Sequence, residues 1–407
     1  MKKTVLREYA KLLVQVGVNI QKGQTLIVHA GLDQPEFVAM VVEEAYKAKA
    51  KEVIVEWSYQ PLTKIHARYK SVKTMSTVHE WELARLEHYC HVLPARLHLV
   101  SADPDGLKGV RMDKISKANK ITHPILKPYR DRRDNKEQWC IAAVPGAAWA
   151  KKVFPGQPKG KAMEMLWEAI LSAARVTEDP IKAWEEHNAN LLSRCQHLNN
   201  LKIQSLHYFA DNGTDFTVGM ISKGTWRGGG DTSLQGIYFN PNMPTEEVFI
   251  SPKKGLAEGI VHSTMPLSYR GQLIDKFWMR FEGGKAVEVG AEVGEDVLKD
   301  MVSMDEGAAY LGECALVPVA SPISESGILY YNTLFDENAS CHLALGRGYA
   351  DTIEGFENLT LEQCREMGLN DSMIHVDFMI GCETMNIDAT CADGSVVRIF
   401  ENGNWAV

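Results

Sequence analysis

Five residues in the second half of the chain carry side chains that commonly bind metal ions. They are Glu247, Glu313, His342, His375 and Asp377, and each lies at the edge of a predicted turn or strand. A single residue separates His375 from Asp377, and because side chains alternate along a strand, this spacing points both to one face. The pair therefore offers one nitrogen and one oxygen ligand to a single ion.

The region around His342 differs in composition from the rest of the chain. Residues 330–351 read YYNTLFDENASCHLALGRGYAD. This segment is more polar than a core element, yet its composition is that of an ordered segment rather than of a linker. We predict that a metal ion holds the polar side chains of this segment together. Its ligands would come from the chain on both sides of the segment. Glu246 adjoins Glu247, and in a strand only one of two neighbours faces a given site.

The mixture of ligand types limits the metals that fit. Two imidazoles with three carboxylates suit zinc, cobalt, manganese or iron better than an oxygen-selective ion or copper(I). The three carboxylates would be neutralised by two divalent ions that share one hydroxide, whereas one ion leaves excess negative charge. The pattern thus favours a site with two divalent ions per chain, and zinc, cobalt, manganese and magnesium all stay open as its metal.

Each of these residues also has a purely structural interpretation. A glutamate beside a strand is usually exposed to solvent, and a single histidine is often hydrogen-bonded within a core. His375 and Asp377 would also form an ordinary hydrogen-bonded pair on a sheet. No H-E-x-x-H motif supports a metal site, because His79 and Glu80 begin one but Leu83 stands where its second histidine belongs. Only the combination of all five residues favours metal binding.

The first half of the chain alternates between apolar strands and amphipathic helices. We predict helices at 4–16, 35–48, 78–90, 114–135, 161–175 and 181–198, and strands at 24–30, 52–57, 96–100 and 139–144. This alternation predicts an α/β domain with a parallel sheet and flanking helices. A glycine-rich segment at 226–236, in the second half of the chain, lacks the order of a phosphate-binding loop, so nucleotide binding has little support.

The second half changes to the two-residue period of antiparallel strands. Asp211-Asn212-Gly213, Gly283-Gly284 and Asp393-Gly394 each separate two strand-like runs and predict hairpins. We therefore expect a mainly antiparallel α+β catalytic domain that binds the metal. The predicted domains are residues 1–203 and 204–407.

Composition excludes several classes of protein. With a net charge of −8 among 407 residues and only short basic runs, the chain lacks a dedicated nucleic-acid surface. Charges interrupt its first residues, and no run of about 18 apolar residues occurs, which argues against a signal peptide and a membrane span. Its eight cysteines form no Cys-x-x-Cys pair, so we expect reduced thiols and a cytoplasmic protein.

Four motifs resemble those of the M29 family of metallo-aminopeptidases, the aminopeptidase T group. They are NMPTEEVF, LGECALVP, LYYNTLFDENASCHLALG and HVDFMIG, in this order, and the first fifty residues resemble the opening of that family. The resemblance spans nearly the whole chain. It implies an aminopeptidase that acts on peptides with a free N-terminus, uses two divalent ions and forms a homodimer.

The resemblance also implies roles for single residues. Glu247, Glu313, His342, His375 and Asp377 match the family's metal ligands, and Tyr349 matches a tyrosine regarded as catalytic. Glu313 is implied either as a bridging ligand or as the general base that accepts a proton from water.

Two other functional classes fit the same residues. One is a two-metal hydrolase of another amide or ester. The other is a non-catalytic, metal-binding dimeric scaffold.

Overall fold

The computed structural model describes residues 1–406, which form two compact units. The first comprises Met1–Glu185 and Gly230–Pro244, and the second comprises Glu186–Gly229 and the chain from Thr245 onward. The sequence predicted a single domain boundary, between residues 203 and 204. In the structure, helix α9 (Pro180–Leu201) carries the chain from the first unit to the second. A later segment then returns to the first unit. The limits 1–203 and 204–407, taken as parts that fold alone, stay a prediction.

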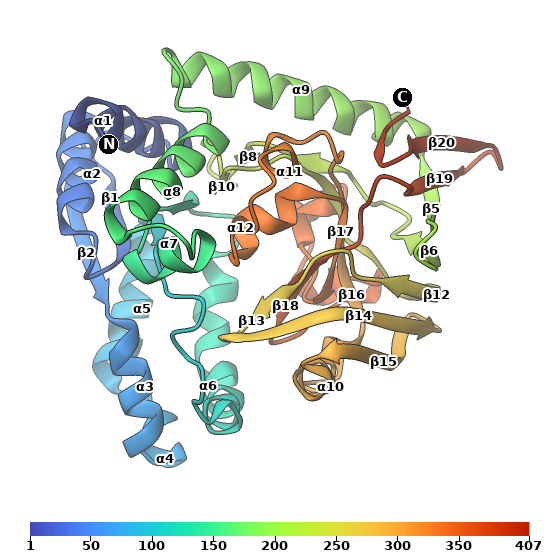
Figure 1. The fold of residues 1–407 in the computed structure, drawn as a ribbon, viewed down its shortest axis with the longest axis horizontal. Helices are drawn as coiled ribbons and strands as arrows, with labels where there is room; N and C mark the ends of the chain where they lie inside the picture. The colour runs from blue at the N-terminus through green and yellow to red at the C-terminus, as the bar shows by residue number, and fades with distance from the viewer. Residues whose placement is uncertain (407) are drawn as a thin grey trace. The chain divides into compact units, whose positions relative to one another are not determined.

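A parallel sheet forms the centre of the first unit, with its strands in the order β10-β4-β3-β1-β2 (Figure 1). Strand β1 reads TLIVHAG and buries three successive apolar residues, as expected of a strand covered on both faces. The strands are β1 (Thr25–Gly31), β2 (Glu52–Ser58), β3 (Ala95–Val100), β4 (Trp139–Ala143) and β10 (Asn242–Met243). The predicted parallel sheet is confirmed, and the short strand β10 extends it from far along the chain.

Eight helices connect and flank these strands. They are α1 (Lys3–Leu12), α2 (Pro35–Lys47), α3 (Gln60–Tyr69), α4 (Val72–Met75), α5 (Glu80–Val92), α6 (Met112–Arg133), α7 (Ala147–Val153) and α8 (Lys159–Ala173). Helices α3, α4 and α7 were not predicted. Helices α4 and α7 have 4 and 7 residues, too few turns to show a clear apolar period. A small hairpin of β8 (Asp231–Thr232) and β9 (Tyr238–Phe239) completes the unit.

Two sheets of antiparallel strands build the second unit. The smaller sheet has the order β18-β17-β16-β11-β7. Its strands are β7 (Arg227–Gly228), β11 (Val248–Ile250), β16 (Leu311–Leu316), β17 (His342–Gly346) and β18 (His375–Met379). The larger sheet contains β5 (Ile203–Phe209), β6 (Asp215–Met220), β12 (Pro252–His262), β13 (Leu267–Tyr269), β14 (Gln272–Glu282), β15 (Lys285–Val293), β19 (Asn386–Cys391), β20 (Val396–Glu401) and β21 (Asn404–Trp405).

All three hairpins predicted from turn residues are present in the larger sheet. Strand β5 pairs with β6, β14 with β15 and β19 with β20, each antiparallel. Short helices lie between the strands of this unit, namely α10 (Glu295–Val302), α11 (Pro322–Glu325), α12 (Thr333–Asp336) and α13 (Leu361–Glu366). The mainly antiparallel α+β character predicted for the second half is therefore confirmed.

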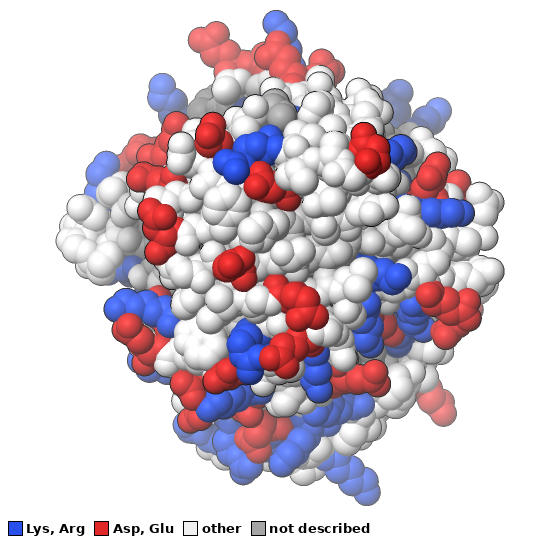
Figure 2. Space-filling view, turned by 90° about the vertical axis from the view of Figure 1, so that its right-hand side faces the viewer, with Lys and Arg blue, Asp and Glu red and all other residues white. Residues whose placement is uncertain are grey.

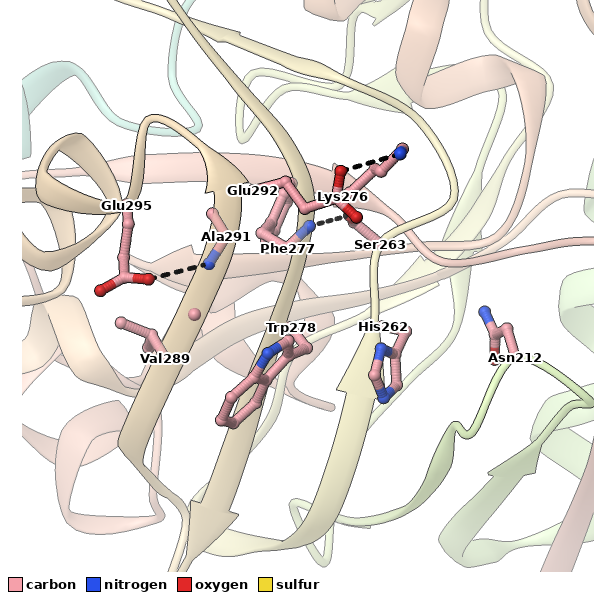
Figure 3. A pocket seen from close by; sticks show the side chains of 11 residues that line it. Asn212, His262, Ser263, Lys276, Phe277, Trp278, Val289, Ala291, Glu292 and Glu295 are labelled. Atoms are coloured by element: carbon pink, nitrogen blue, oxygen red, sulfur yellow. Dashed lines mark hydrogen bonds and ion pairs between the residues drawn. The ribbon is translucent and has the colours of Figure 1, made fainter.

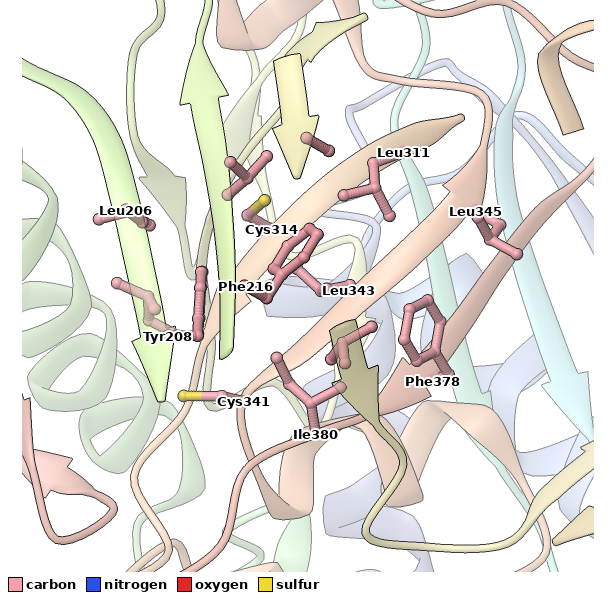
Figure 4. Packing of buried hydrophobic residues seen from close by; sticks show 14 of the residues in the cluster. Leu206, Tyr208, Phe216, Leu311, Cys314, Cys341, Leu343, Leu345, Phe378 and Ile380 are labelled. Atoms are coloured by element: carbon pink, nitrogen blue, oxygen red, sulfur yellow. The ribbon is translucent and has the colours of Figure 1, made fainter. Parts of the chain in front are cut away.

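One hydrophobic cluster joins the two sheets of the second unit. Leu206 and Phe216 of the larger sheet and Leu343, Leu345 and Phe378 of the smaller sheet all belong to it and are at most 1% exposed. Figure 4 shows these side chains converging from β5, β6, β17 and β18. Each large apolar side chain buried in this way contributes roughly 1.5–3 kcal/mol. The cluster therefore fixes which face of the smaller sheet is turned away from the core.

Charged side chains of both signs are intermingled on the molecular face in Figure 2, around an area with few charges. Exposed ion pairs in the larger sheet join Arg280 to Glu288 and Lys276 to Glu292. Exposed pairs of this kind contribute little to stability. Within residues 1–406, no helix is both long enough and apolar enough to cross a membrane.

Candidate metal centre

Strand alternation places four of the five predicted ligands on one face of the smaller sheet. In β17, Leu343 and Leu345 enter the hydrophobic cluster, so His342 points to the opposite side. In β18 the cluster takes Val376 and Phe378, which leaves His375 and Asp377 on the other face, as their spacing predicted. The core packing thus orients these side chains.

Glu313 lies within strand β16, whereas the sequence predicted it at the edge of a turn or strand. Its neighbour Cys314 enters the hydrophobic cluster, so the carboxylate points to the same face as the histidines. In the register of the sheet, Ala344 stands between Glu313 and Asp377. The small alanine side chain leaves space between the two carboxylates.

The predicted ligands form two overlapping groups. Ligand atoms of Glu247, Glu313 and His342 all lie within 4.8 Å of one another, and the same holds for Glu313, His375 and Asp377. His342 Nε2 is 3.0 Å from Glu247 Oε2. His375 Nε2 is 3.0 Å from Glu313 Oε2 and 3.1 Å from Asp377 Oδ1. Glu313 belongs to both groups, the position that a bridging carboxylate requires.

Both histidines have their second ring nitrogen bound to a backbone carbonyl. His342 Nδ1 lies 3.2 Å from the oxygen of Ser340, and His375 Nδ1 lies 2.7 Å from that of Arg347. Because a carbonyl oxygen only accepts, each Nδ1 carries a hydrogen. In the neutral ring the lone pair is then on Nε2, which faces the carboxylates. Metal-binding histidines are held in this way, so the residues fit a divalent metal.

Burial and charge shift the protonation of this cluster strongly. Burial raises the pKa of Glu313 to about 7; the negative charge of Glu247 adds to this shift and the hydrogen bond from His375 opposes it. Burial works to lower the pKa of His342, but the bond to Glu247 and the surrounding carboxylates raise it to about 9. For His375, burial is likewise outweighed by Asp377 and Glu313, which raise its pKa well above the usual value. Without cations, this cluster therefore retains protons at neutral pH.

A fourth acidic residue, Glu337, belongs to the same cluster and was missed by the sequence analysis. It lies in a short 3-10 turn at Glu337–Ala339, is 9% exposed and forms a hydrogen bond with Asp377. Burial, followed by the charges of Asp377, Glu247 and Glu313, raises its pKa far above normal. The sequence signal that could have identified it is the acidic pair Asp336-Glu337 at the start of the DENASCH motif. Taken alone, such a pair looks like two ordinary surface residues.

Tyr349, which the family resemblance implied to be catalytic, lies beside the cluster. Its ring packs on that of His375 with centroids 4.9 Å apart, and its other side contacts Phe249. Burial and the negative charges of Glu313 and Asp377 raise the pKa of its phenol well above 10. The hydroxyl therefore keeps its proton and remains a hydrogen-bond donor.

A separate hollow of about 560 Å³ lies on the larger sheet, near Asn212, His262 and Trp278 (Figure 3). It contains none of the residues of the histidine and carboxylate cluster. Lys276 is paired with Glu292 there, and the amide of Ala291 bonds to Glu295. The clustered ligands, rather than this hollow, carry the candidate chemistry.

Comparison with known proteins places the whole chain in one family. The family described as thermophilic metalloprotease (M29) matches residues 2–405. The chain is 45% identical to aminopeptidase AmpS of Bacillus subtilis (strain 168) over 403 residues, 98% of each chain. It is 38% identical to aminopeptidase T of Thermus aquaticus over 404 residues, 99% of this chain and 98% of that protein.

A solved structure gives the same result in three dimensions. The structure described as wild-type AmpT from Thermus thermophilus superposes with a TM-score of 0.89 at 36% identity, and the match covers 100% of both chains. The chain accordingly belongs to the M29 family of metallopeptidases, the family that its motifs resemble.

Proposed function

We propose that this chain is a metal-dependent aminopeptidase that removes N-terminal residues from peptides. The observation that carries the proposal is the buried position of Glu313, shared by two groups of histidine and carboxylate ligands. The family of metalloproteases to which the chain belongs, and its relatives named as aminopeptidases, support the reaction and the substrate class.

Two divalent ions per chain fit this arrangement best. Glu247, Glu313 and His342 would hold one ion, and Glu313, His375 and Asp377 the other, with Glu337 adjoining Asp377. When bound, such ions lower the pKa of water and polarise a substrate carbonyl. The ligands combine imidazole and carboxylate, so zinc, cobalt and manganese suit them well. Magnesium, a hard cation that prefers oxygen ligands, suits them less well.

Glu313 is the residue best suited to accept a proton from the attacking water. Its carboxylate is buried and belongs to both groups of ligands, and a general base must lie within hydrogen-bond reach of the proton that it accepts. Its shared position also suits a bridging ligand, and one carboxylate can serve both purposes. Tyr349 would donate its hydroxyl hydrogen to the oxygen that becomes negative in the transition state.

An aminopeptidase also has to recognise the free amino group of its substrate. Glu246 is a buried carboxylate next to Glu247, and a carboxylate pairs well with an ammonium group. We assign it this role within the proposed function. Homodimer formation and a cytoplasmic location rest on the family resemblance and composition, and sedimentation velocity of the purified chain tests the first of these.

The proposal is tested with chromogenic amino-acid amides and their N-acetylated counterparts. The metal-loaded chain should release the chromophore only from amides with a free amino group. Equal hydrolysis of acetylated substrates would instead identify a general amide hydrolase. No hydrolysis of any substrate by metal-loaded protein would support a non-catalytic scaffold.

A further inference from the structure

One peptide bond beside the candidate metal centre is held by side chains at both of its polar atoms. It joins Thr245 to Glu246. The carbonyl oxygen of Thr245 lies 2.7 Å from His187 Nε2, and the amide nitrogen of Glu246 lies 2.7 Å from Asn338 Oδ1. Because both atoms belong to one rigid plane, the two bonds together fix its orientation. The next residue is the predicted ligand Glu247.

The hydrogen-bond directions on both sides are unambiguous. A carbonyl oxygen only accepts, so His187 carries a hydrogen on Nε2. Asn338 accepts through Oδ1 and donates through Nδ2 to the carbonyl of Leu334, at 3.0 Å, and to Glu337 Oε1, at 3.4 Å. Asn338 is itself fully buried. It therefore joins the segment of Glu247 to the segment of Glu337.

Glu247 differs from the other predicted ligands in its backbone support. Glu313, His342, His375 and Asp377 lie inside paired strands, where backbone hydrogen bonds set the direction of each side chain. Glu247 precedes strand β11, whose pairing with β16 begins at Val248. The bonds from His187 and Asn338 replace that support at the preceding peptide bond.

We infer that His187 and Asn338 are positioning residues that orient Glu247 toward Glu313 and His342. This inference rests on the proposed function, because Glu247 needs that orientation only if it binds a metal. Neither residue touches the reacting atoms. Each acts on the peptide plane that precedes the ligand, His187 from helix α9 and Asn338 from the turn that contains Glu337.

Removing the donor of His187 should weaken metal binding. His187→Ala frees the carbonyl side of the peptide bond, and loss of support behind a ligand typically lowers metal affinity by about tenfold or more. His187→Gln retains an N–H donor on a side chain of similar reach. It should return the affinity to within roughly threefold of the original, because one hydrogen bond is restored.

Asn199 provides a matched control on the same helix. Its amide bonds to both the N–H and the carbonyl of Trp226, at 2.8 and 3.3 Å, which is another side-chain support of backbone outside the metal centre. Asn199→Ala should lower the melting temperature to an extent similar to His187→Ala. It should leave metal affinity unchanged.

The experiment titrates chelator-treated full-length chains with Co²⁺ against a chromophoric competitor, and records melting temperatures without metal. Weaker affinity in His187→Ala, recovery in His187→Gln and no change in Asn199→Ala would support the inference. Equal affinity in His187→Ala and the parent, or equal weakening in Asn199→Ala, would overturn it. If the parent chain itself bound no metal, the proposed function would fail first, and the two failures are thus distinguished.

Discussion

The phenol ring of Tyr349 packs against the imidazole of His375, with ring centroids 4.9 Å apart and planes inclined by 54°. This contact places a protonated hydroxyl beside the ligand cluster without making the tyrosine part of it. Tyr349→Phe keeps the ring and removes only the donor. We expect kcat to fall by about 10²-fold, the usual effect of losing one oxyanion donor.

Metal content is the control for this variant. Because the phenylalanine ring still supports His375, the metal bound per chain should equal that of the parent. Steady-state kinetics with metal analysis on the same samples measures both. An unchanged kcat would remove Tyr349 from the mechanism.

Glu337 and Asp336 are adjacent buried carboxyl groups with different expected roles. Glu337 faces the ligand cluster, and its raised pKa keeps it protonated in the metal-free chain. Glu337→Gln imitates that protonated form, so the stability of the metal-free chain should change little. Metal affinity should fall by about tenfold or more, because the amide cannot become a carboxylate.

Asp336→Asn should lower the stability of the metal-free chain and leave metal affinity largely unchanged, the opposite of Glu337→Gln. The carboxylate of Asp336 accepts hydrogen bonds from the backbone amides of Tyr330 and Asn332, at 2.8 and 2.9 Å. An asparagine would turn a donor toward a donor and cost about 1–3 kcal/mol of stability. Urea unfolding and metal titration of both variants decide the matter. Identical behaviour of the two would show that Glu337 has only a structural role.

Metal binding should release protons and tighten as the pH rises. Glu313, with a pKa of about 7, and His342, with a pKa of about 9, hold protons in the metal-free chain at neutral pH. Their binding to a metal requires the deprotonated forms, so the dissociation constant should fall from about pH 6 to about pH 9. Titrations at several pH values measure this. A constant affinity over that range would contradict the protonation described here.

The first unit contains a separate pH-sensitive group. His98 stacks on His29 with centroids 4.4 Å apart, and burial, with the charges of His29 and Arg96, lowers the pKa of His98 to about 3. An unfolded histidine has a pKa near 6.5, so between about pH 6.5 and 3 the unfolded chain binds more protons. This group's contribution to stability is complete above that range and is lost as the pH falls through it.

His98→Gln removes this titration. The free energy of unfolding, measured in urea at about pH 5 to 6, should therefore fall less steeply with acidity than in the parent. The difference in slope should be about 1 kcal/mol per pH unit for one proton. Parallel slopes would show that His98 does not resist protonation in the fold.

The fold was predictable where the chain repeats a simple period over many residues. The apolar runs of β1 and β2 and the glycine turns of the larger sheet have local causes, so the sequence alone predicted them. Strand β10 has two residues and pairs with a strand a hundred residues earlier, and no local pattern indicates such pairing. The same limit hid the return of 230–244 to the first unit.

The candidate site likewise has features that local sequence predicts and features that it does not. The spacing of His375 and Asp377 predicted their common face because both lie in one strand. The alignment of Glu313, Ala344 and Asp377 across three strands depends on sheet register, which spacing does not reveal. Glu337 escaped notice because burial, not its type, makes it part of the cluster. Family resemblance supplied the ligand set that local patterns left open.

The most direct test of the metal-dependent aminopeptidase measures activity and metal content together. Chelator-treated chain would receive increasing zinc, cobalt, manganese or magnesium, with hydrolysis of a free aminoacyl amide recorded at each step. We predict that activity is absent without metal and reaches its maximum near two bound ions per chain, as a two-metal site requires. Full activity in the metal-free chain, or metal binding without any hydrolysis, would contradict this account.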